Sequence, residues 1–157
     1  MVWQPNESTM LIATGSLTAE AEIRELIDDK IIAVYNRDEH ALISKYAPDV
    51  TTFDLAGALQ NNGGLAERLE KWFSGYVGHI NQEVANVQVS ASGAVAFSNF
   101  LMRTWGTGVN GEEHDMWYRV TSGYKNIGGQ WLITHEHISE PVDLETGKAM
   151  FGLKPLN

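Results

Sequence analysis

The sequence predicts an α+β fold, with helices in the first half of the chain and strands in the second. Apolar residues recur at helical spacing from Ile23 to Val34, whereas apolar and polar residues alternate from residue 79 onward. Asn110-Gly111 lies between two of the alternating segments and is a strong signal for a β-hairpin turn. Because helices and antiparallel strands that are separated along the chain pack in layers, we expect helices to cover one face of a sheet.

Each element has its own local signal. Thr18 is a good N-cap for the first helix, and Asp38 for a short second helix that stops before Pro48. A strand over 50–56 and a helix over 65–76 follow, and the alternating segments 79–89, 94–105, 113–124 and 130–139 predict four long strands. Residues 1–16 lack such a pattern, so we expect a flexible N-terminal tail followed by one domain over residues 17–157.

Composition narrows the possible partners. The chain has 157 residues and a formal net charge of −9, which disfavours nucleic acid and anionic membrane surfaces as partners. The absence of cysteine rules out disulfides and thiolate metal sites, and no apolar run is long enough to span a membrane. The segment before residue 17 does not resemble a secretory signal, so we expect a cytoplasmic protein.

Several sequence segments occur in the same order as in a known superfamily and are similar to its segments. They are "EIRELIDDKIIAVYNRD", "YAPDVTTFD", "LAERLEKWF", "DMWYRVT" and "GGQWLITHEHISEP" followed by "DLETGKA", and they extend over residues 19–155. Together they resemble the NTF2-like superfamily, in its SnoaL-like and ketosteroid-isomerase-like branch. The resemblance implies a cone of three N-terminal helices packed on a curved, mostly antiparallel sheet (the cystatin-like fold). It also implies a central pocket for a small molecule, and a homodimer formed through the outer sheet face. It does not imply one activity.

Asp54 is the best candidate for a catalytic base. It lies among apolar residues at the end of a predicted strand, where burial would raise the pKa of a carboxylate. In the resemblance to ketosteroid isomerase, Asp54 matches the proton-shuttling aspartate. The position of that enzyme's oxyanion-hole tyrosine falls at or near Lys30 and Ile31, and Tyr35 comes more than one helical turn later. We therefore do not expect steroid isomerisation. The alternative role for Asp54 is to cap a turn or to pair with an arginine.

Arg103 and Arg119 lie in the middle of predicted strands. The resemblance implies that they are candidate ligands for a carboxylate, because arginines in similar strands of this superfamily's assembly domains bind carboxylates. A two-residue turn at Asn110-Gly111 would place Met102 opposite Arg119, so that the two arginines point to opposite sides of the sheet. Arg119 would then face the pocket together with Trp117. The alternative for both arginines is an ion pair on the surface or in a dimer interface.

His135 and His137 alternate with Glu136 along the last predicted strand. Strict alternation places Trp131, Ile133 and both histidines on one face, and Glu136 on the other. Because Glu136 cannot then join the histidines around an ion, we expect no metal site. His135 is the deeper of the two and is a candidate for ligand contact or proton transfer. A neutral histidine hydrogen-bonded near the pocket is the alternative.

The candidate residues leave two classes of function open. The predicted catalytic residues are Asp54 and His135, and the predicted ligand-binding residues are Tyr35, Trp72, Arg103, Trp117, Arg119 and His137. One function is cofactor-free isomerase, cyclase or hydratase chemistry on a small, largely apolar ligand that bears a carbonyl or carboxylate group. The other is a non-catalytic binding or dimeric assembly module. No dinucleotide or phosphate-binding motif is present, so we expect no cofactor.

Overall fold

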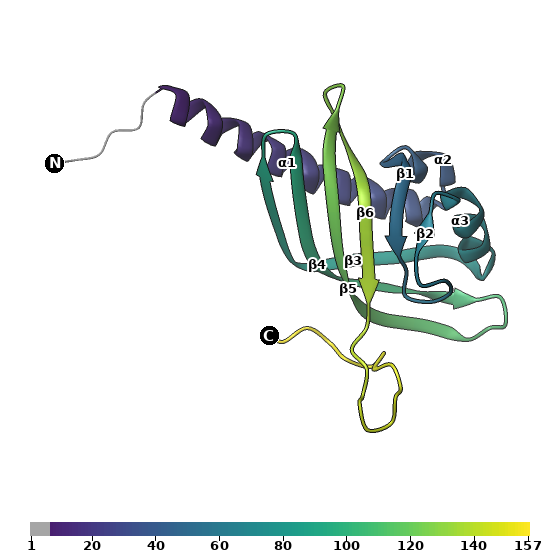
Figure 1. The fold of residues 1–157 in the computed structure, drawn as a ribbon. Helices are drawn as coiled ribbons and strands as arrows, with labels where there is room; N and C mark the ends of the chain where they lie inside the picture. The colour runs from purple at the N-terminus through teal and green to yellow at the C-terminus, as the bar shows by residue number, and fades with distance from the viewer. Residues whose placement is uncertain (1–6) are drawn as a thin grey trace.

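The computed structural model describes the backbone of residues 7–157 and the side chains of residue 15 and residues 17–157. Its elements, in chain order, are α1 (Glu7–Asn36), α2 (Glu39–Ile43), β1 (Tyr46–Phe53), β2 (Asn61–Asn62), α3 (Leu65–Ser74), β3 (Tyr76–Ser92), β4 (Val95–Gly108), β5 (Glu113–Ile127) and β6 (Gln130–Ser139) (Figure 1). This order confirms the predicted α+β class. No helix in the described part of the chain is long and apolar enough to cross a membrane.

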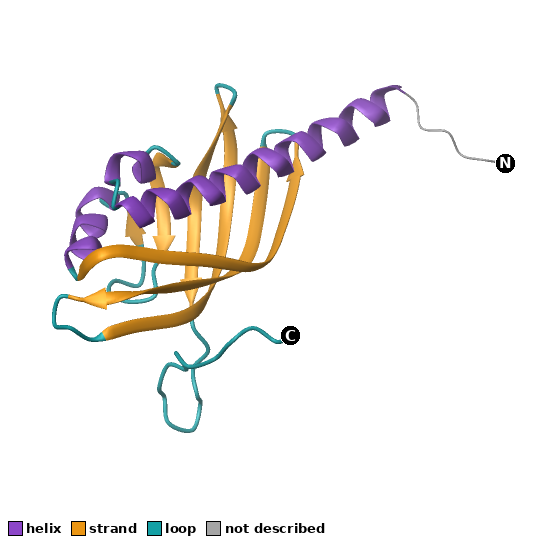
Figure 2. Ribbon diagram, turned by 180° about the vertical axis from the view of Figure 1, so that it is seen from behind, coloured by secondary structure: helices purple, strands orange, loops and turns teal. Residues whose placement is uncertain are grey.

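The strands form one sheet in the order β2-β1-β6-β5-β4-β3. β1 runs parallel to β6, and the other neighbouring strands are antiparallel. The sheet is curved, and the three helices lie on its concave side (Figure 2). Within the described residues, no helix lies on the opposite, convex face.

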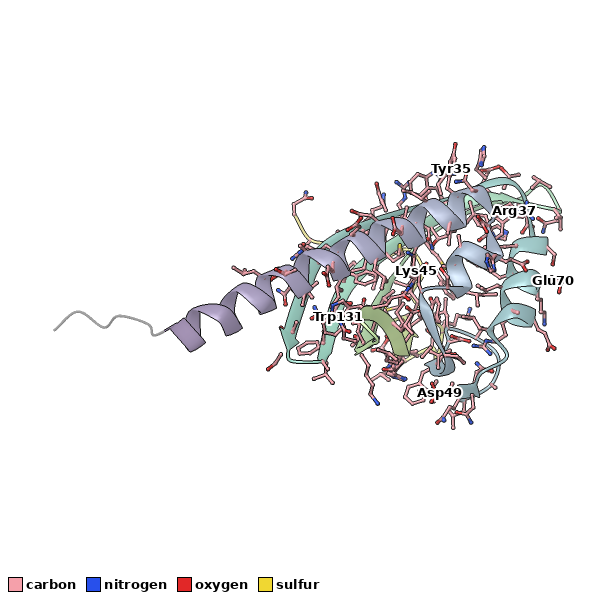
Figure 3. All side chains as sticks on the ribbon, turned by 90° about the horizontal axis from the view of Figure 1, so that it is seen from above. Tyr35, Arg37, Lys45, Asp49, Glu70 and Trp131 are labelled. Atoms are coloured by element: carbon pink, nitrogen blue, oxygen red, sulfur yellow. The ribbon has the colours of Figure 1, made fainter. Side chains whose placement is uncertain are left out.

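The core lies between α1 and the concave face of the sheet. Ile23, Leu26 and Ile27 of α1 pack against Phe100 and Ile133 of the strands, and all five side chains are buried. Trp131 lies beside α1 (Figure 3), and its indole N–H donates a hydrogen bond to Glu22 over 2.9 Å. A second buried cluster joins the end of α1 to α2, α3 and the start of β3; its members are Ala33, Val34, Leu42, Leu69, Phe73, Tyr76 and Ile80.

Helix α1 begins at Glu7, well before the predicted N-cap Thr18. Residues 7–16, part of the segment predicted as a tail, are helical, and residues 1–6 lie outside the described residues. The segment contains no proline that would stop a helix. The N-terminal turns of α1 extend past the sheet (Figure 1), and Ala19 is the first residue of the described side chains to be buried.

The β4–β5 hairpin has a longer loop than the predicted two-residue turn. The backbone N–H of Gly108 donates to Glu112, and Gly111 adopts a positive φ of 81°, as in three-residue hairpin loops. The register shifts by one residue, so that Leu101 lies opposite Arg119 and Arg103 lies opposite Trp117. Arg103, Trp117 and Arg119 consequently share the convex face, which corrects the prediction that the arginines point to opposite sides.

A β-bulge at Thr134 interrupts the alternation of β6. Tyr124 pairs with Ile133 and Gly123 pairs with His135, so Thr134 has no partner on β5. Beyond the bulge, Glu136 is buried at 7% exposure, whereas His137 is exposed. The prediction that both histidines share the face of Ile133 is therefore wrong: Glu136 occupies the interior face instead.

Candidate functional site in the concave interior

Glu136 is at the centre of a polar cluster inside the concave face. Lys30 Nζ donates to its Oε2 over 2.9 Å, and the Tyr46 hydroxyl donates to its Oε1 over 3.0 Å. Ser122 Oγ donates to Oε2 over 3.2 Å. The donors come from α1, β1 and β5, and the Lys30 and Glu136 side chains are only 12% and 9% exposed. The buried carboxylate is therefore fully paired, as a charge in this environment requires.

Three tyrosines surround this ion pair. Burial raises the pKa of Tyr118 to about 12, and it raises the pKa of Tyr124 as well. Burial and the neighbouring Glu136 carboxylate raise the pKa of Tyr46 well above its ordinary value. All three phenols are therefore neutral hydrogen-bond donors at physiological pH. We call Lys30, Tyr46, Tyr118, Ser122, Tyr124 and Glu136 the interior polar cluster.

The phenol groups at the edge of the cluster have further partners. Tyr124 shares a hydrogen bond of 2.8 Å with Ser98, and Tyr118 shares one of 2.6 Å with Thr104. Gln82 donates to the hydroxyl groups of both Thr104 and Tyr118. This network fixes the orientation of hydroxyl groups on the concave face, and such preorganised dipoles are suited to hold a ligand oxygen or a developing oxyanion.

Lys30 is the cationic member of the interior polar cluster. Its ammonium lies 5.0 Å from the centroid of the Tyr46 ring, in addition to its ion pair with Glu136. The carboxylate and the ring face both attract a positive charge. Lys30 therefore supplies a positive charge and N–H donors to the interior.

Asp54 follows the end of β1 and forms an ion pair with Arg68. Its Oδ2 lies 3.2 Å from Arg68 Nε and accepts a 2.9 Å hydrogen bond from Asn61. Arg68 also donates to Thr52 Oγ1 over 3.1 Å. Asp54 follows Phe53, which pairs with His137 of β6, so Asp54 lies next to the part of β6 that carries Glu136. This arginine-paired geometry is the one expected for the alternative role of Asp54.

His135 and His137 lie on the side of β6 away from the interior polar cluster. His135 Nδ1 is 3.0 Å from both the hydroxyl and the carbonyl oxygen of Thr51. The ring of Phe53 packs edge-on against both imidazoles, with centroid distances of 4.7 and 5.3 Å. The two histidines therefore contact residues of β1, and their side chains point away from Glu136.

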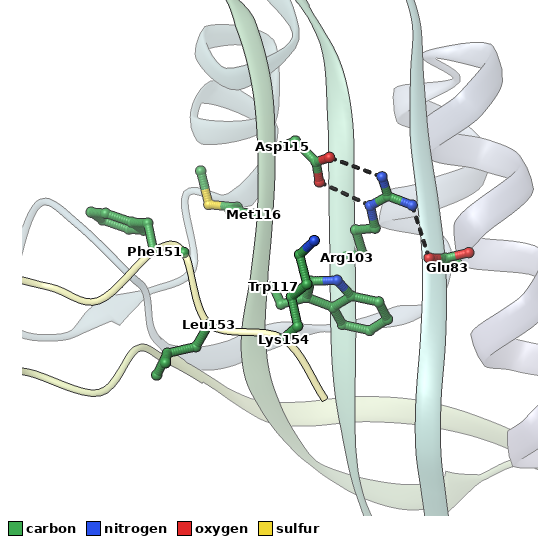
Figure 4. A pocket seen from close by; sticks show the side chains of 9 residues that line it. Glu83, Arg103, Asp115, Met116, Trp117, Phe151, Leu153 and Lys154 are labelled. Atoms are coloured by element: carbon green, nitrogen blue, oxygen red, sulfur yellow. Dashed lines mark hydrogen bonds and ion pairs between the residues drawn. The ribbon is translucent and has the colours of Figure 1, made fainter. Parts of the chain in front are cut away.

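Arg103 and Trp117 line a hollow on the convex face. Arg103 binds both carboxylate oxygens of Asp115 at 2.8 Å and one of Glu83 at 3.1 Å, and these hydrogen bonds raise its pKa further. The C-terminal segment over residues 151–154 completes a hollow of about 280 Å³ (Figure 4). Arg119 is exposed on the same face, and its Nε donates to Ser139 over 3.1 Å.

Tyr35 and Trp72 lie at the end of the molecule where α1 and α3 finish. Tyr35 is at the C-terminal end of α1 (Figure 3), is 41% exposed, and stacks on His79 with 4.0 Å between ring centroids. Trp72 is partly buried and contacts the rings of Phe73 and Tyr76. Neither residue is hydrogen-bonded to the interior polar cluster.

The sequence reasoning missed Glu136 and Lys30 as a pair. Lys30 did carry a signal, because it falls at helical spacing between Ile27 and Val34 on the apolar stripe of α1. Glu136 carried none, since its inward direction depends on the bulge at Thr134.

The model of the SnoaL-like domain matches residues 23–143, which is most of the chain. The chain belongs to the SnoaL-like family. An NTF2-like protein of unknown function from Pseudomonas putida shares 39% sequence identity with this SnoaL-like protein. The match covers 89% of this chain and 99% of that chain, with a TM-score of 0.81. The predicted NTF2-like fold is thereby confirmed. No curated protein matches the chain.

Two more distant structures share the fold. A hexachlorocyclohexane dehydrochlorinase (LinA type 2) is 17% identical, with 78% of this chain and 84% of that chain covered and a TM-score of 0.68. The association domain of CaMKII from C. elegans is 18% identical. The match covers 80% of this chain and 98% of that chain, with a TM-score of 0.65. At this identity the likeness extends to the fold alone.

Proposed function

We propose that this SnoaL-like protein binds a small, largely apolar molecule in its concave interior, with a carbonyl or carboxylate oxygen held by the interior polar cluster. The observation that carries the proposal is the buried Lys30–Glu136 pair, which is surrounded by oriented hydroxyl groups and by apolar side chains such as Val120 and Ile133. Ligand sites combine apolar walls with a few convergent polar groups in this way. The dehydrochlorinase of the same fold supports a small-molecule site.

We further propose cofactor-free proton transfer with Asp54 as the base. Asp54 lies next to the part of β6 that carries Glu136, and we propose that the ammonium of Lys30 stabilises an enolate oxygen. Asp54 must leave Arg68 before it accepts a proton, so ligand entry has to open this ion pair. His135 lies on the side of β6 away from the cluster, and we assign it no step.

Binding is tested by thermal shift with three small molecules that share two fused six-membered carbon rings. 1-Tetralone carries a carbonyl, 1-naphthoic acid carries a carboxylate, and tetralin carries neither. We expect the first two to raise the Tm and tetralin to have less effect. Ser122→Ala should reduce the shift, while Thr121→Ala, on the exposed face of the same strand, should not. Absence of a shift with both oxygen-bearing probes would show the binding proposal to be wrong.

Proton transfer is tested separately, by NMR detection of deuterium exchange at the α-carbon of 1-tetralone in D₂O. We expect the wild type to accelerate exchange and Asp54→Asn to lose most of the acceleration. The control is Asp49→Asn, because Asp49 is exposed on β1, the strand that Asp54 follows. If Asp54→Asn exchanges as fast as the wild type, Asp54 is not the base.

A dimeric assembly role is the second candidate. Val95 and Phe97 are each more than 50% exposed on the convex side of the sheet, and exposed apolar side chains of this kind mark association surfaces. The likeness to an association domain supports the same role. We propose that two copies pair through this face, which would leave both concave interiors accessible.

A further inference from the structure

Two asparagines of the chain, Asn62 and Asn110, directly precede a glycine. In such a pair the backbone nitrogen of the glycine can attack the side-chain amide carbon of the asparagine, because a glycine has no Cβ to hinder the approach. The new N–C bond closes a five-membered succinimide ring, the glycine nitrogen gives up its proton, and the amide nitrogen leaves as ammonia. Water then opens the ring to aspartate or isoaspartate. The surroundings of each pair determine how fast this reaction runs.

Asn110 and Gly111 lie in the loop between β4 and β5, and both are exposed. The side-chain Oδ1 of Asn110 accepts a hydrogen bond from the backbone N–H of Glu112 over 3.1 Å. Negative charge develops on this oxygen when the amide carbon is attacked, so a fixed N–H donor stabilises the intermediate. The loop therefore holds the amide of Asn110 in a geometry that favours attack.

The imidazole of His114 lies beside the same amide. A Cβ placed on Gly108 would be 2.8 Å from Asn110 Oδ1 and 3.0 Å from His114 Nε2, so the two side chains approach each other over this glycine. The ring of Tyr76 packs edge-on against His114, with 5.3 Å between the centroids. The departing ammonia needs a proton, and an imidazole is the side chain best suited to supply one near neutral pH.

Asn62 is held differently. It belongs to β2 and pairs with Thr51 of β1, so its backbone is part of the sheet. Its Oδ1 accepts a 2.7 Å hydrogen bond from the exposed side chain of Gln60 instead of a backbone N–H. In both pairs the glycine N–H donates to a backbone carbonyl over 2.9 Å, so this bond does not distinguish them. The structure therefore favours reaction at Asn110 over Asn62.

We propose that Asn110-Gly111 is a site of self-modification, at which Asn110 converts to aspartate or isoaspartate with His114 as the general acid for the departing ammonia. Water is the one reagent that the reaction consumes. The product places a carboxylate close to Glu112 and Glu113 in the sequence. In its isoaspartate form the product also lengthens the main chain of the β4–β5 loop. The modification is independent of the function proposed above.

The test follows both asparagines in one sample by peptide mapping, after incubation of the full chain at neutral pH and physiological temperature. The tryptic fragments 46–68 and 104–119 separate Asn62 from Asn110. We expect Asn110 to deamidate about tenfold faster than Asn62, which is less than a well-placed general acid contributes. In concentrated urea the two rates should become similar. Equal rates in the folded protein, or a tenfold difference that persists in urea, would overturn the proposal.

The variant His114→Gln tests the general acid. It should slow the reaction at Asn110 about tenfold. The rate at Asn62 should stay the same, which shows in the same molecule that the fold is intact. His40→Gln is the matched control, because His40 is exposed on α2, and it should change neither rate. If the reaction at Asn110 is as fast or faster in His114→Gln, His114 is not the acid and the proposal is wrong.

Discussion

Glu136 keeps a carboxylate in the interior because three donors from different elements compensate for its charge. The gain from a buried ion pair is largely offset by the desolvation of its two groups, so such a pair contributes little net stability. An apolar pair of the same volume would serve the core equally well. Stability alone therefore does not account for Lys30 and Glu136 in this core, which agrees with the polar ligand proposed above.

Removal of one partner should be much more costly than removal of both. Lys30→Met leaves Glu136 buried without its cation, and we expect a loss of about 3–5 kcal/mol in the free energy of unfolding, measured by urea denaturation. The double variant Lys30→Met/Glu136→Met should lose clearly less. Lys45→Met is the control, because its ion pair with Asp29 is more exposed and is worth at most about 1 kcal/mol. Equal losses in the single and double variants would contradict the argument.

Tyr118 should make the fold sensitive to alkaline pH. Its folded pKa of about 12 exceeds the unfolded value of about 10, so between these values the unfolded chain loses a proton that the folded chain retains. The free energy of unfolding should therefore fall from pH 10 to pH 12, by about 1.4 kcal/mol per pH unit for this group. Tyr118→Phe should make the decline shallower, and Tyr35→Phe, at a more exposed phenol, should not. The check is chemical denaturation over this pH range.

At the scale of the element, periodicity predicted which segments form helices and strands, and it could not predict how their registers shift. The helical stripe of α1 and the alternation after residue 79 both arise because one face of each element is buried. Such burial is visible in the sequence as a periodic pattern of apolar residues. The extra loop residue of the β4–β5 hairpin and the bulge at Thr134 arise from local backbone geometry. Each changes which side chain faces the interior, so the fold was predicted far better than the site.

The bulge itself can be tested by deletion. Removal of Thr134 should leave Trp131 and Glu136 on the interior face, because Thr134 is the unpaired residue. Removal of Leu132 instead shifts the segment before the bulge by one residue and moves Trp131 out of the core. We expect the second deletion to cost about 3–5 kcal/mol more than the first, as loss of a buried tryptophan does. Similar thermal unfolding of the two variants would show that Thr134 is not the residue that sets the register.

At the scale of the whole molecule, the curved sheet separates two surfaces of different composition. The concave face is closed by α1 and holds the interior polar cluster, whereas the convex face exposes apolar side chains and the hollow beside Arg103. Each chain carries a net charge of −9, so two copies repel one another at long range. Association through the convex face must overcome this repulsion, and we therefore expect it to strengthen as salt rises.

A charge at Phe97 on the convex face should dissociate the proposed dimer. Phe97 is 53% exposed in the single chain, and Phe97→Glu would place an unpaired carboxylate in the interface and add to the like-charge repulsion. We expect sedimentation velocity to show a dimer for the wild type and a monomer for Phe97→Glu, with at least a hundredfold increase in Kd, about 3 kcal/mol. Leu59→Glu is the matched control, because Leu59 is 97% exposed in the loop between β1 and β2. If Phe97→Glu stays dimeric, the copies associate through another face; if the wild type is monomeric, the assembly role is wrong.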